Sequence, residues 1–541
     1  MGVRRRLRLD RPDLPGLARL PGEAGRRPGA VRPLGPVRRP LGADVLRPRP
    51  GPAQRGASLS ATAPADAAVQ DTDGGDGRPV LFALHSLGSS AREFDRVREL
   101  LADEVDVVAL DLPGFGDLAD RTGTASGTDV DAMARSVVAR IAEIAPARWM
   151  LLGHSMGGKV ATVVASRVLD GSAPLFGLAG VVLVAASPLS PEPMDEARRT
   201  TMIGWAEQGG IGDLHARTFI LGDLADTDSL DPGRLEATVA DVRRTNPEAW
   251  RAWLERGSQE DWSERISGLP VPALILAGAE DGDLDLDAQR RLTAPAFANP
   301  ELAEIDRVAH LIPAERPEAL AGAVRRFWRE RAGLGRAVPR DFARVLASDR
   351  TSARTRAVLA ERALADDPDY APVVLDRDQL DRLRLLADHL VPQTGPAIDL
   401  AARVDAQLAT GVGDGWRPAD APPDAEAYRR ALDALAEWAR IPDADARGEA
   451  LDRLGSGELA SWLEDVAVDL ARQWLAHPAT MAEVGFDGIA NGGDGERQQG
   501  FVELRAGRLE SWEPLTPSTA ARPESGAGAG PAADTDAEAR S

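Results

Sequence analysis

The chain contains no cysteine, only one lysine and no long apolar run. Without cysteine, disulfide bonds, thiolate metal sites and covalently attached haem are excluded. No stretch approaches the roughly 18 consecutive apolar residues of a membrane span, so we expect no membrane-spanning helix. The net charge of −21 at pH 7 makes general binding to nucleic acid unfavourable.

The two ends of the chain have compositions that do not predict a folded core. Residues 1–76 are rich in Arg, Pro, Gly and Ala without apolar periodicity, which favours either a disordered arm or a start codon assigned too far upstream. No apolar segment follows the three arginines at 4–6, so we do not expect an export signal, and we expect a cytoplasmic location, with periplasmic or extracellular association as the alternative. Residues 516–541 are expected to form a disordered tail.

The most informative motif is Gly-His-Ser-Met-Gly-Gly at residues 153–158, between a strand-like run and a helix-like stretch. A serine on such a sharp turn has a strained backbone that only small neighbours tolerate, which explains Gly153 and Gly157. The turn exposes the hydroxyl of Ser155 at the carboxyl edge of a sheet and at the positive end of a helix. The pattern predicts a serine nucleophile, and a glycine-rich turn without chemistry is the alternative.

A nucleophilic serine needs a carboxylate that orients its base. The apolar run at 271–278 is followed by Ala-Glu-Asp-Gly-Asp, and we expect Asp281 to be that carboxylate. Glu280 and Asp283 are the alternative assignments, and a solvated acidic loop is the other interpretation.

The base is predicted to be His310, on the loop after the last expected strand. The three side chains then follow one another in the order Ser, Asp, His that this architecture requires. A solvated loop histidine is the alternative for His310. The chain has six histidines, and among the others we expect His85 and His154 to be structural. We expect His215 to lie in a solvated loop, and contact with the substrate is the alternative.

Two backbone amides are expected to bind the oxyanion of a tetrahedral intermediate. The apolar run at 79–84 ends in His85 and Ser86, and the amide of Leu87 is predicted to be one donor. The amide of Met156, directly after the serine, is predicted to be the other.

A long segment separates the apolar run at 181–186 from the next one, and at about eighty residues it exceeds a simple strand-to-helix connection. We expect it to form a helical cap at about 191–268. Its helix-like segments carry Trp205, Trp250 and Trp253, which either line an apolar acyl pocket or pack the cap helices together.

Five short segments occur in a recognisable order: His-Ser-Leu-Gly at 85–88, Asp-Leu-Pro-Gly-Phe-Gly at 111–116, Gly-His-Ser-Met-Gly-Gly at 153–158, Gly-Ala-Glu-Asp at 278–281 and Ala-His-Leu-Ile-Pro at 309–313. On these segments, residues 78–332 resemble the α/β-hydrolase fold superfamily. Ser86 and Ala309 stand where the family commonly has glycine. A serine at the elbow argues against the branches that use aspartate there, and it leaves esterases, lipases, amidases, C–C hydrolases and cofactor-free perhydrolases.

The resemblance implies hydrolysis of a small carboxylic ester or a related acyl substrate. His310, oriented by Asp281, would remove the proton of Ser155 as it attacks the acyl carbon. The amides of Leu87 and Met156 would hold the oxyanion, and water would then release the acid. No cofactor and no metal are expected.

The composition changes after the hydrolase-like region at 77–334. Residues 335–375 are charged and rich in alanine, and we expect a linker with one helix at about 352–365. From 376 to 515, apolar residues recur at helix spacing, which predicts a small helical bundle. The seams are expected at Leu380, Leu383, Leu386, Ala387, Leu390, Val404, Leu408, Leu432, Leu435, Trp438, Leu459, Trp462, Leu463, Val466, Leu470 and Trp474.

The residues that characterise this bundle are Leu-Asp-Arg-Leu-Arg-Leu-Leu-Ala-Asp-His-Leu-Val-Pro at 380–392, His-Pro at 477–478, Gly-Phe at 485–486 and Gly488. On them, residues 376–515 resemble gluconate 2-dehydrogenase subunit 3, the small non-catalytic partner of a flavoprotein dehydrogenase. The resemblance implies a docking module for a flavoprotein oxidoreductase of the glucose-methanol-choline type. The region has no glycine-rich dinucleotide fingerprint, so we do not expect it to carry the flavin itself.

The sequence therefore predicts an α/β protein, in which an α/β-hydrolase sheet with a helical cap is followed by a small all-α helical domain. Two functions compete. In one, the chain is a serine hydrolase whose helical region docks a redox partner. In the other, it is a non-catalytic accessory subunit of the oxidoreductase, and the hydrolase domain is a scaffold. We favour the first, because a scaffold has no physical need for an elbow serine with a base and an acid in order.

Overall fold

The fold is described from a computed structural model. The structure describes residues 78–494 except 121–128, 207–208, 227, 412–421, 487 and 490–492. The predicted disordered arm at 1–76 and tail at 516–541 lie outside the described residues, and so does the end of the predicted helical domain, 495–515.

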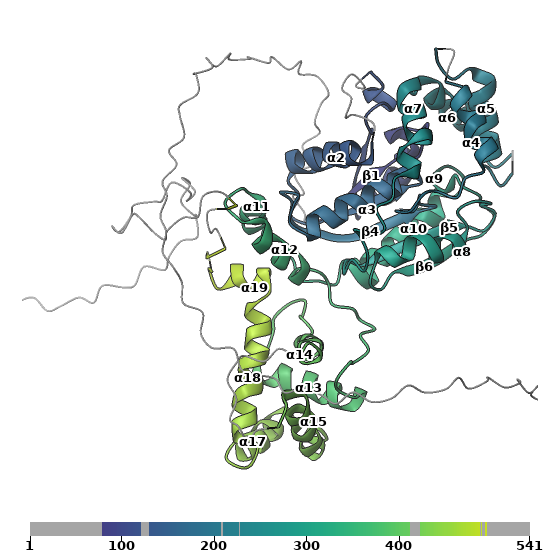
Figure 1. The fold of residues 1–541 in the computed structure, drawn as a ribbon. Coiled ribbons are helices and arrows are strands. Elements are labelled where there is room, and N and C mark those ends of the chain that lie inside the picture. Colours follow the sequence, from purple (N-terminus) through teal and green to yellow (C-terminus); the bar gives the residue numbers. More distant parts are fainter. Residues whose placement is uncertain are drawn as a thin grey trace, which may run out of the picture. The chain divides into compact units, whose positions relative to one another are not determined.

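A parallel sheet of six strands forms the centre of the hydrolase-like region (Figure 1). The strands are β1 (Val80–Leu84), β2 (Asp106–Leu110), β3 (Trp149–His154), β4 (Leu178–Val184), β5 (Ala273–Gly278) and β6 (Glu301–Ile305). Their order across the sheet is β2-β1-β3-β4-β5-β6, and every neighbouring pair is parallel. Parallel strands need crossover helices that cover both faces of the sheet, which is why every residue of β1, β3, β4 and β5 is buried. The predicted α/β class is confirmed.

The side chains of each strand alternate between two hydrophobic cores, one on each face of the sheet. In β1, Phe82 packs into the core that includes α2 and α3, whereas Leu81 packs into the core that includes α1 and α10. These helices are α1 (Asp95–Leu101), α2 (Val130–Ile144), α3 (Met156–Leu169) and α10 (Pro317–Phe327). The short helices α8 (Leu286–Ala288) and α9 (Ile312–Glu315) follow β5 and β6. The loops at the carboxyl ends of β1, β3, β5 and β6 are therefore held on a rigid base.

The described residues between β4 and β5, in the segment expected to be a cap, contain four α-helices, and Figure 1 shows them grouped together. They are α4 (Glu196–Gly204), α5 (Asp213–Gly222), α6 (Pro232–Arg244) and α7 (Pro247–Glu255). The sequence patterns did not predict α5. The expectation for His215 is wrong, because it lies within α5, half-buried, and its ring stacks on that of Trp205 with centroids 5.2 Å apart.

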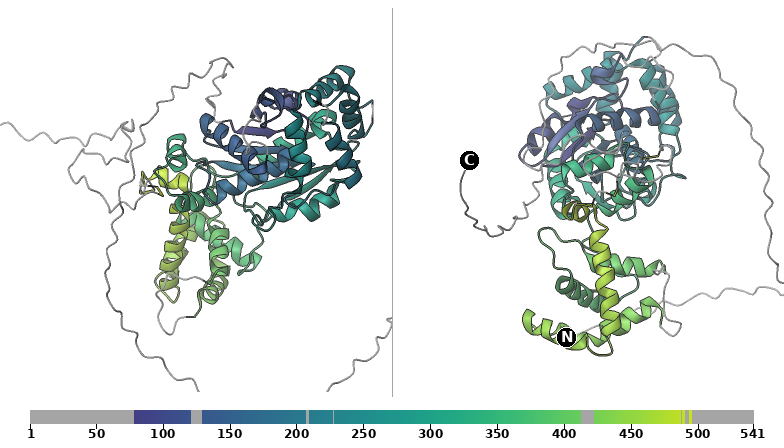
Figure 2. Two further views of the ribbon diagram at one scale, coloured as in Figure 1. Left: turned by 45° about the horizontal axis from the view of Figure 1, so that its top comes forward. Right: turned by 90° about the vertical axis from the view of Figure 1, so that its left-hand side faces the viewer.

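A helical region follows the sheet, drawn in green to yellow in Figure 2. Its helices are α11 (Arg340–Ala347), α12 (Ala353–Arg362), α13 (Arg377–Leu390), α14 (Leu400–Ala409), α15 (Asp424–Ala434), α16 (Ala436–Ala439), α17 (Ala444–Leu454), α18 (Ala460–Leu475) and α19 (Pro478–Glu483). The predicted seams from Leu380 to Trp474 meet in one hydrophobic core. In the described part of the chain, no helix is both long enough and apolar enough to cross a membrane.

Candidate active site

Ser155 occupies the sharp turn between β3 and α3. Its φ of 49° and ψ of −117° are strained for a residue with a side chain. A Cβ atom at Gly153 would lie 2.4 Å from the carbonyl oxygen of Gly157, and one at Gly157 would lie 2.2 Å from that of Leu84. Both positions therefore require glycine, as the sequence motif predicted.

Asp281 and His310 lie on the loops that follow β5 and β6, and their side chains are in contact. His310 Nδ1 is 2.8 Å from Asp281 Oδ2. The other carboxylate oxygen, Oδ1, accepts backbone N–H groups of Asp283 at 3.1 Å and Leu284 at 3.0 Å. The carboxylate is thus held from both sides. Asp283, an alternative for the acid, instead forms an ion pair with Arg198 at 2.8 Å.

A cavity of about 310 Å³ brings the candidate side chains together, since Ser155, Asp281, His310 and Leu87 all line it. Its apolar lining includes Met202, Phe219, Leu224 and Trp253. Met156 is the first residue of α3, and such an N–H group has no partner within its helix. It is therefore available to an oxyanion beside Ser155.

Acidic side chains dominate the charge of this cavity. Burial alone would lower the pKa of His310, but Asp281, Asp223 and Glu192 outweigh it and raise that pKa to about 9. Burial alone would raise the pKa of Asp281, but His310 outweighs it and lowers that pKa to about 2. Burial raises the pKa of both Asp223 and Glu192. The site thus favours a protonated His310 when the cavity is empty.

Three charged residues of the cavity were not predicted, and all three come from the cap segment. The carboxylate of Asp223 accepts from Arg198 Nη2 at 2.6 Å, and the backbone oxygen of Asp223 accepts the N–H of His310 at 3.1 Å. Glu192 accepts from the hydroxyl of Ser187 at 2.6 Å. Glu192, Arg198 and Asp223 lie in no recognisable sequence motif. They could not be predicted, because only the fold of the cap brings them to the catalytic loops.

The two histidines expected to be structural have fully hydrogen-bonded rings. His85 Nδ1 is 2.7 Å from the carbonyl oxygen of Ser86, and His85 Nε2 accepts the N–H of Leu112 at 3.0 Å. His154 contacts Glu93 through Nδ1 at 2.7 Å and the carbonyl oxygen of His310 through Nε2 at 2.8 Å. His85 thus ties the loop after β1 to the loop after β2, and His154 ties the elbow to the loop that carries His310.

The cap tryptophans divide between the two expected roles. Trp253 lines the cavity beside Ser155. Trp250 is fully buried and donates its indole N–H to the carbonyl oxygen of Met202 at 2.8 Å, so it packs the cap helices together.

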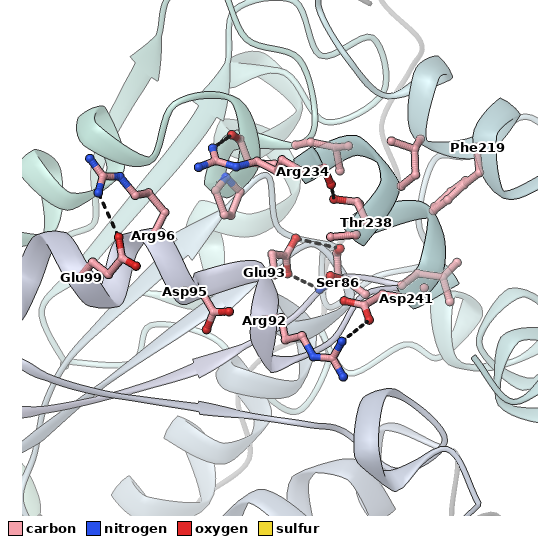
Figure 3. Close-up of a pocket in the computed structure, with 18 residues that line it drawn as sticks. Ser86, Arg92, Glu93, Asp95, Arg96, Glu99, Phe219, Arg234, Thr238 and Asp241 are labelled. Carbon is pink, nitrogen blue, oxygen red and sulfur yellow. Dashed lines mark hydrogen bonds and ion pairs between the residues drawn. The ribbon is translucent and has the colours of Figure 1, made fainter. Parts of the chain in front are cut away.

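A second cavity of about 300 Å³ shares Leu87 and Phe219 with the first (Figure 3). Two pairs of its charged side chains lie in contact. Figure 3 shows Arg92 beside Asp241 and Arg96 beside Glu99, with Nη1–Oδ1 and Nη1–Oε2 distances of 3.8 and 3.0 Å. None of the three candidate catalytic side chains lines this cavity.

Histidine and carboxylate side chains are the usual protein ligands of metal ions. Within the residues that the structure describes, no group of three or more His, Asp or Glu side chains is arranged to hold a metal ion.

Known proteins match the part of the chain that carries this site. Residues 80–324 match the model of the alpha/beta hydrolase family. An uncharacterized hydrolase of Bacillus subtilis, YugF, is 25% identical over 264 residues, which cover 46% of this chain and 90% of that protein. The pimeloyl-[acyl-carrier protein] methyl ester esterase of Klebsiella pneumoniae is 29% identical over 215 residues, which cover 38% of this chain and 77% of that protein.

Solved structures match the same part of the chain. A thermophilic esterase from Thermogutta terrifontis is 24% identical with a TM-score of 0.39, covering 47% of this chain and 90% of that one. A bromoperoxidase from Bacillus anthracis is 18% identical with a TM-score of 0.42, covering 47% of this chain and 92% of that one. Together with the parallel sheet and the serine elbow, the family match shows that residues 80–324 form a domain of the alpha/beta hydrolase superfamily.

Proposed function

We propose that the chain is a serine hydrolase that cleaves a carboxylic ester or a related acyl substrate. The observation that carries this proposal is the 2.8 Å contact between His310 and Asp281, in a cavity that the elbow serine Ser155 also lines. The esterase names of relatives support the same reaction class.

The residues act in a fixed order. His310 takes the proton of Ser155 as the hydroxyl oxygen attacks the acyl carbon, and Asp281 stabilises the imidazolium that forms. The amides of Leu87 and Met156 stabilise the negative oxygen of the tetrahedral intermediate. His310 then protonates the leaving group, and water attacks the acyl-enzyme by the same steps in reverse. Loss of one such amide donor costs about two to three orders of magnitude in turnover.

Labelling with a fluorophosphonate, which reacts with activated serines, tests this proposal. The wild-type chain should be labelled, and Ser155→Ala should be neither labelled nor active on short p-nitrophenyl esters while keeping its circular dichroism spectrum. Ser166→Ala, which changes another serine of α3, is the matched control and should label normally. Wild-type turnover by Ser155→Ala would refute the mechanism.

The helical region after the hydrolase domain is proposed to dock a separate flavoprotein oxidoreductase. The support is the resemblance of residues 376–515 to gluconate 2-dehydrogenase subunit 3, together with apolar side chains that are exposed near its end, Val468, Leu475, Val484 and Phe486. Affinity purification of the full chain should recover a flavin-containing oxidoreductase, identified by its peptides and its flavin absorbance. Recovery of that enzyme by a chain that the fluorophosphonate does not label would favour the accessory-subunit alternative.

A further inference from the structure

A buried carboxylate outside the predicted triad holds the loop after β1. Glu93 belongs to the short helix Ala91–Phe94, and its side chain is only 6% exposed. Its Oε2 accepts the backbone N–H of Ser86 at 3.0 Å, and its Oε1 accepts the Ser86 hydroxyl at 3.1 Å. Figure 3 shows both contacts as dashed lines. Glu93 therefore fixes the residue directly before the proposed oxyanion donor Leu87.

The same carboxylate reaches the other two catalytic loops through one imidazole. Glu93 Oε1 is 2.7 Å from His154 Nδ1, and His154 Nε2 is 2.8 Å from the carbonyl oxygen of His310. The rings of His154 and His310 lie with their centroids 5.2 Å apart. Glu93 thus connects the loop after β1, the elbow after β3 and the loop after β6.

The hydrogen-bonding groups of His310, His154 and Glu93 determine where the hydrogens between them lie. The carbonyl oxygen of His310 can only accept, so His154 Nε2 must carry a hydrogen. The 2.7 Å contact between His154 Nδ1 and Glu93 Oε1 then needs a second hydrogen between the two atoms. The pair therefore holds one shared proton. Burial alone would raise the pKa of Glu93, but His154 outweighs it and lowers that pKa.

Ser86 is part of this arrangement. Its side chain takes no space from the catalytic cavity, which Leu87 lines and Ser86 does not. The hydroxyl instead points to Glu93. Its role is therefore to add one hydrogen bond that glycine could not make.

We propose that Glu93, acting through Ser86 and His154, is a positioning residue that fixes the oxyanion loop and the backbone of His310 relative to Ser155. This inference rests on the proposed hydrolase function. A misplacement of about 1 Å in a catalytic constellation can cost about 100-fold in rate. Glu93 touches none of the reacting atoms, so its loss should lower kcat without abolishing substrate binding.

The test compares Glu93→Ala with Glu93→Gln on p-nitrophenyl acetate, with each rate divided by the amount of folded protein. We expect Glu93→Ala to lower kcat by about 30- to 100-fold, with KM changed by less than about threefold. Glutamine should restore kcat to within about fivefold, since its amide can donate to His154 Nδ1 and its oxygen can accept from Ser86. The control is Thr162→Val, which removes a buried hydrogen bond within α3, to the Gly158 oxygen, and no contact of Glu93, Ser86 or His154.

Two further variants keep the proposal testable if Glu93→Ala does not fold. Ser86→Ala removes only the hydrogen bond from the Ser86 hydroxyl to Glu93. His154→Gln removes the imidazole that connects Glu93 to the carbonyl oxygen of His310. Both should lower kcat more than Thr162→Val does, even where the three variants lower the melting temperature by the same amount. Unchanged kcat in these variants would overturn the positioning role while Ser155→Ala remained inactive. Activity that persists in Ser155→Ala would instead refute the hydrolase mechanism itself.

Discussion

His310 makes its 2.8 Å contact to Asp281 through Nδ1. Because Nδ1 is engaged, Nε2 is the ring nitrogen that can exchange a proton with the Ser155 hydroxyl. The carboxylate therefore selects the tautomer as well as the orientation of the base. Asp281 can do so because two backbone N–H groups hold its other oxygen.

Replacing Asp281 by asparagine should lower kcat by about four orders of magnitude, because the amide can hold the wrong imidazole tautomer. Glu280→Gln and Asp283→Asn are matched controls on the same loop, and we expect each to change kcat by less than about tenfold. Steady-state kinetics on p-nitrophenyl butyrate checks all three. Loss of activity in Asp283→Asn alone would show that Asp283, rather than Asp281, is the carboxylate that orients the base.

The pH dependence of kcat/KM should reflect the carboxylates that surround the proposed base, His310. His310 must be neutral to accept a proton, and its pKa is raised to about 9. The value of kcat/KM, which reports the free enzyme, should therefore rise from pH 7 to about 9 and then level off. Glu192→Gln removes a negative charge that helps to raise the pKa of His310. This variant should shift the rise to lower pH and be more active than the wild type at pH 7.

Glu280→Gln is the control for that profile, because Glu280 lines the same cavity but lies next to the acid rather than facing His310 from the cap. A profile already level at pH 7 in the wild type, or one that Glu192→Gln does not move, would contradict the assignment.

The cavity charge also predicts which acyl groups are accepted. Glu192, Asp223, Glu280, Asp281 and Asp283 line it, against a single guanidinium. That guanidinium, of Arg198, already pairs with two of the carboxylates. We expect kcat/KM for p-nitrophenyl butyrate to exceed that for mono-p-nitrophenyl succinate by about tenfold or more, because like charges disfavour binding. Equal values, after correction for the alkaline hydrolysis rates of the two esters, would contradict this selectivity.

Much of the proposed site could be predicted from the sequence because its parts are local. A strained elbow requires glycine at Gly153 and Gly157, and each carboxyl end of a buried parallel strand points to the same edge of the sheet. These two constraints are enough to predict that Ser155, Asp281 and His310 lie together.

The parts that could not be predicted depend on contacts between distant segments. Arg198 and Asp223 come from the cap, whose helices carry no motif. Glu93 lies in an ordinary Ala-Arg-Glu-Phe segment that carries no motif. Its proposed role depends on the contact with His154, which lies 61 residues further along the chain. The helix α5 escaped prediction because its apolar residues do not form one buried stripe, since Leu214 is exposed whereas Ala216 and Ile220 are buried.

The only lysine of the chain should contribute strongly to stability. Lys159 is fully buried, and its ammonium donates to the carbonyl oxygens of Gly257, Ser258 and Glu260 at 3.2, 3.2 and 2.8 Å. Burial lowers its pKa to about 8. Lys159→Met should lower the free energy of unfolding by about 2–4 kcal/mol, since three buried acceptors lose their donor. Urea unfolding measures this, and a loss no larger than that of Thr162→Val would contradict it.

The region at 335–375, expected to be a linker, contains two helices that pack on the hydrolase domain. In α12, Arg356 donates to the carbonyl oxygen of Gly171 at 2.7 Å, just beyond α3. A Cβ atom at Gly171 would lie 2.0 Å from the carbonyl oxygen of Ala353, so the two backbones are in direct contact. Leu346 and Leu359 share a small core with Phe176.

These contacts predict where the hydrolase domain can be cut. A chain of residues 78–375 should keep esterase activity and most of its stability, because every proposed catalytic residue and both helices remain. A chain of residues 78–335 should unfold at a lower temperature, because Phe176 becomes exposed and the Gly171 carbonyl loses its donor. Thermal unfolding and turnover of p-nitrophenyl butyrate distinguish the two chains. Equal melting temperatures would show that α11 and α12 contribute nothing to the domain, and loss of activity at residue 375 would show that the later helices complete the site.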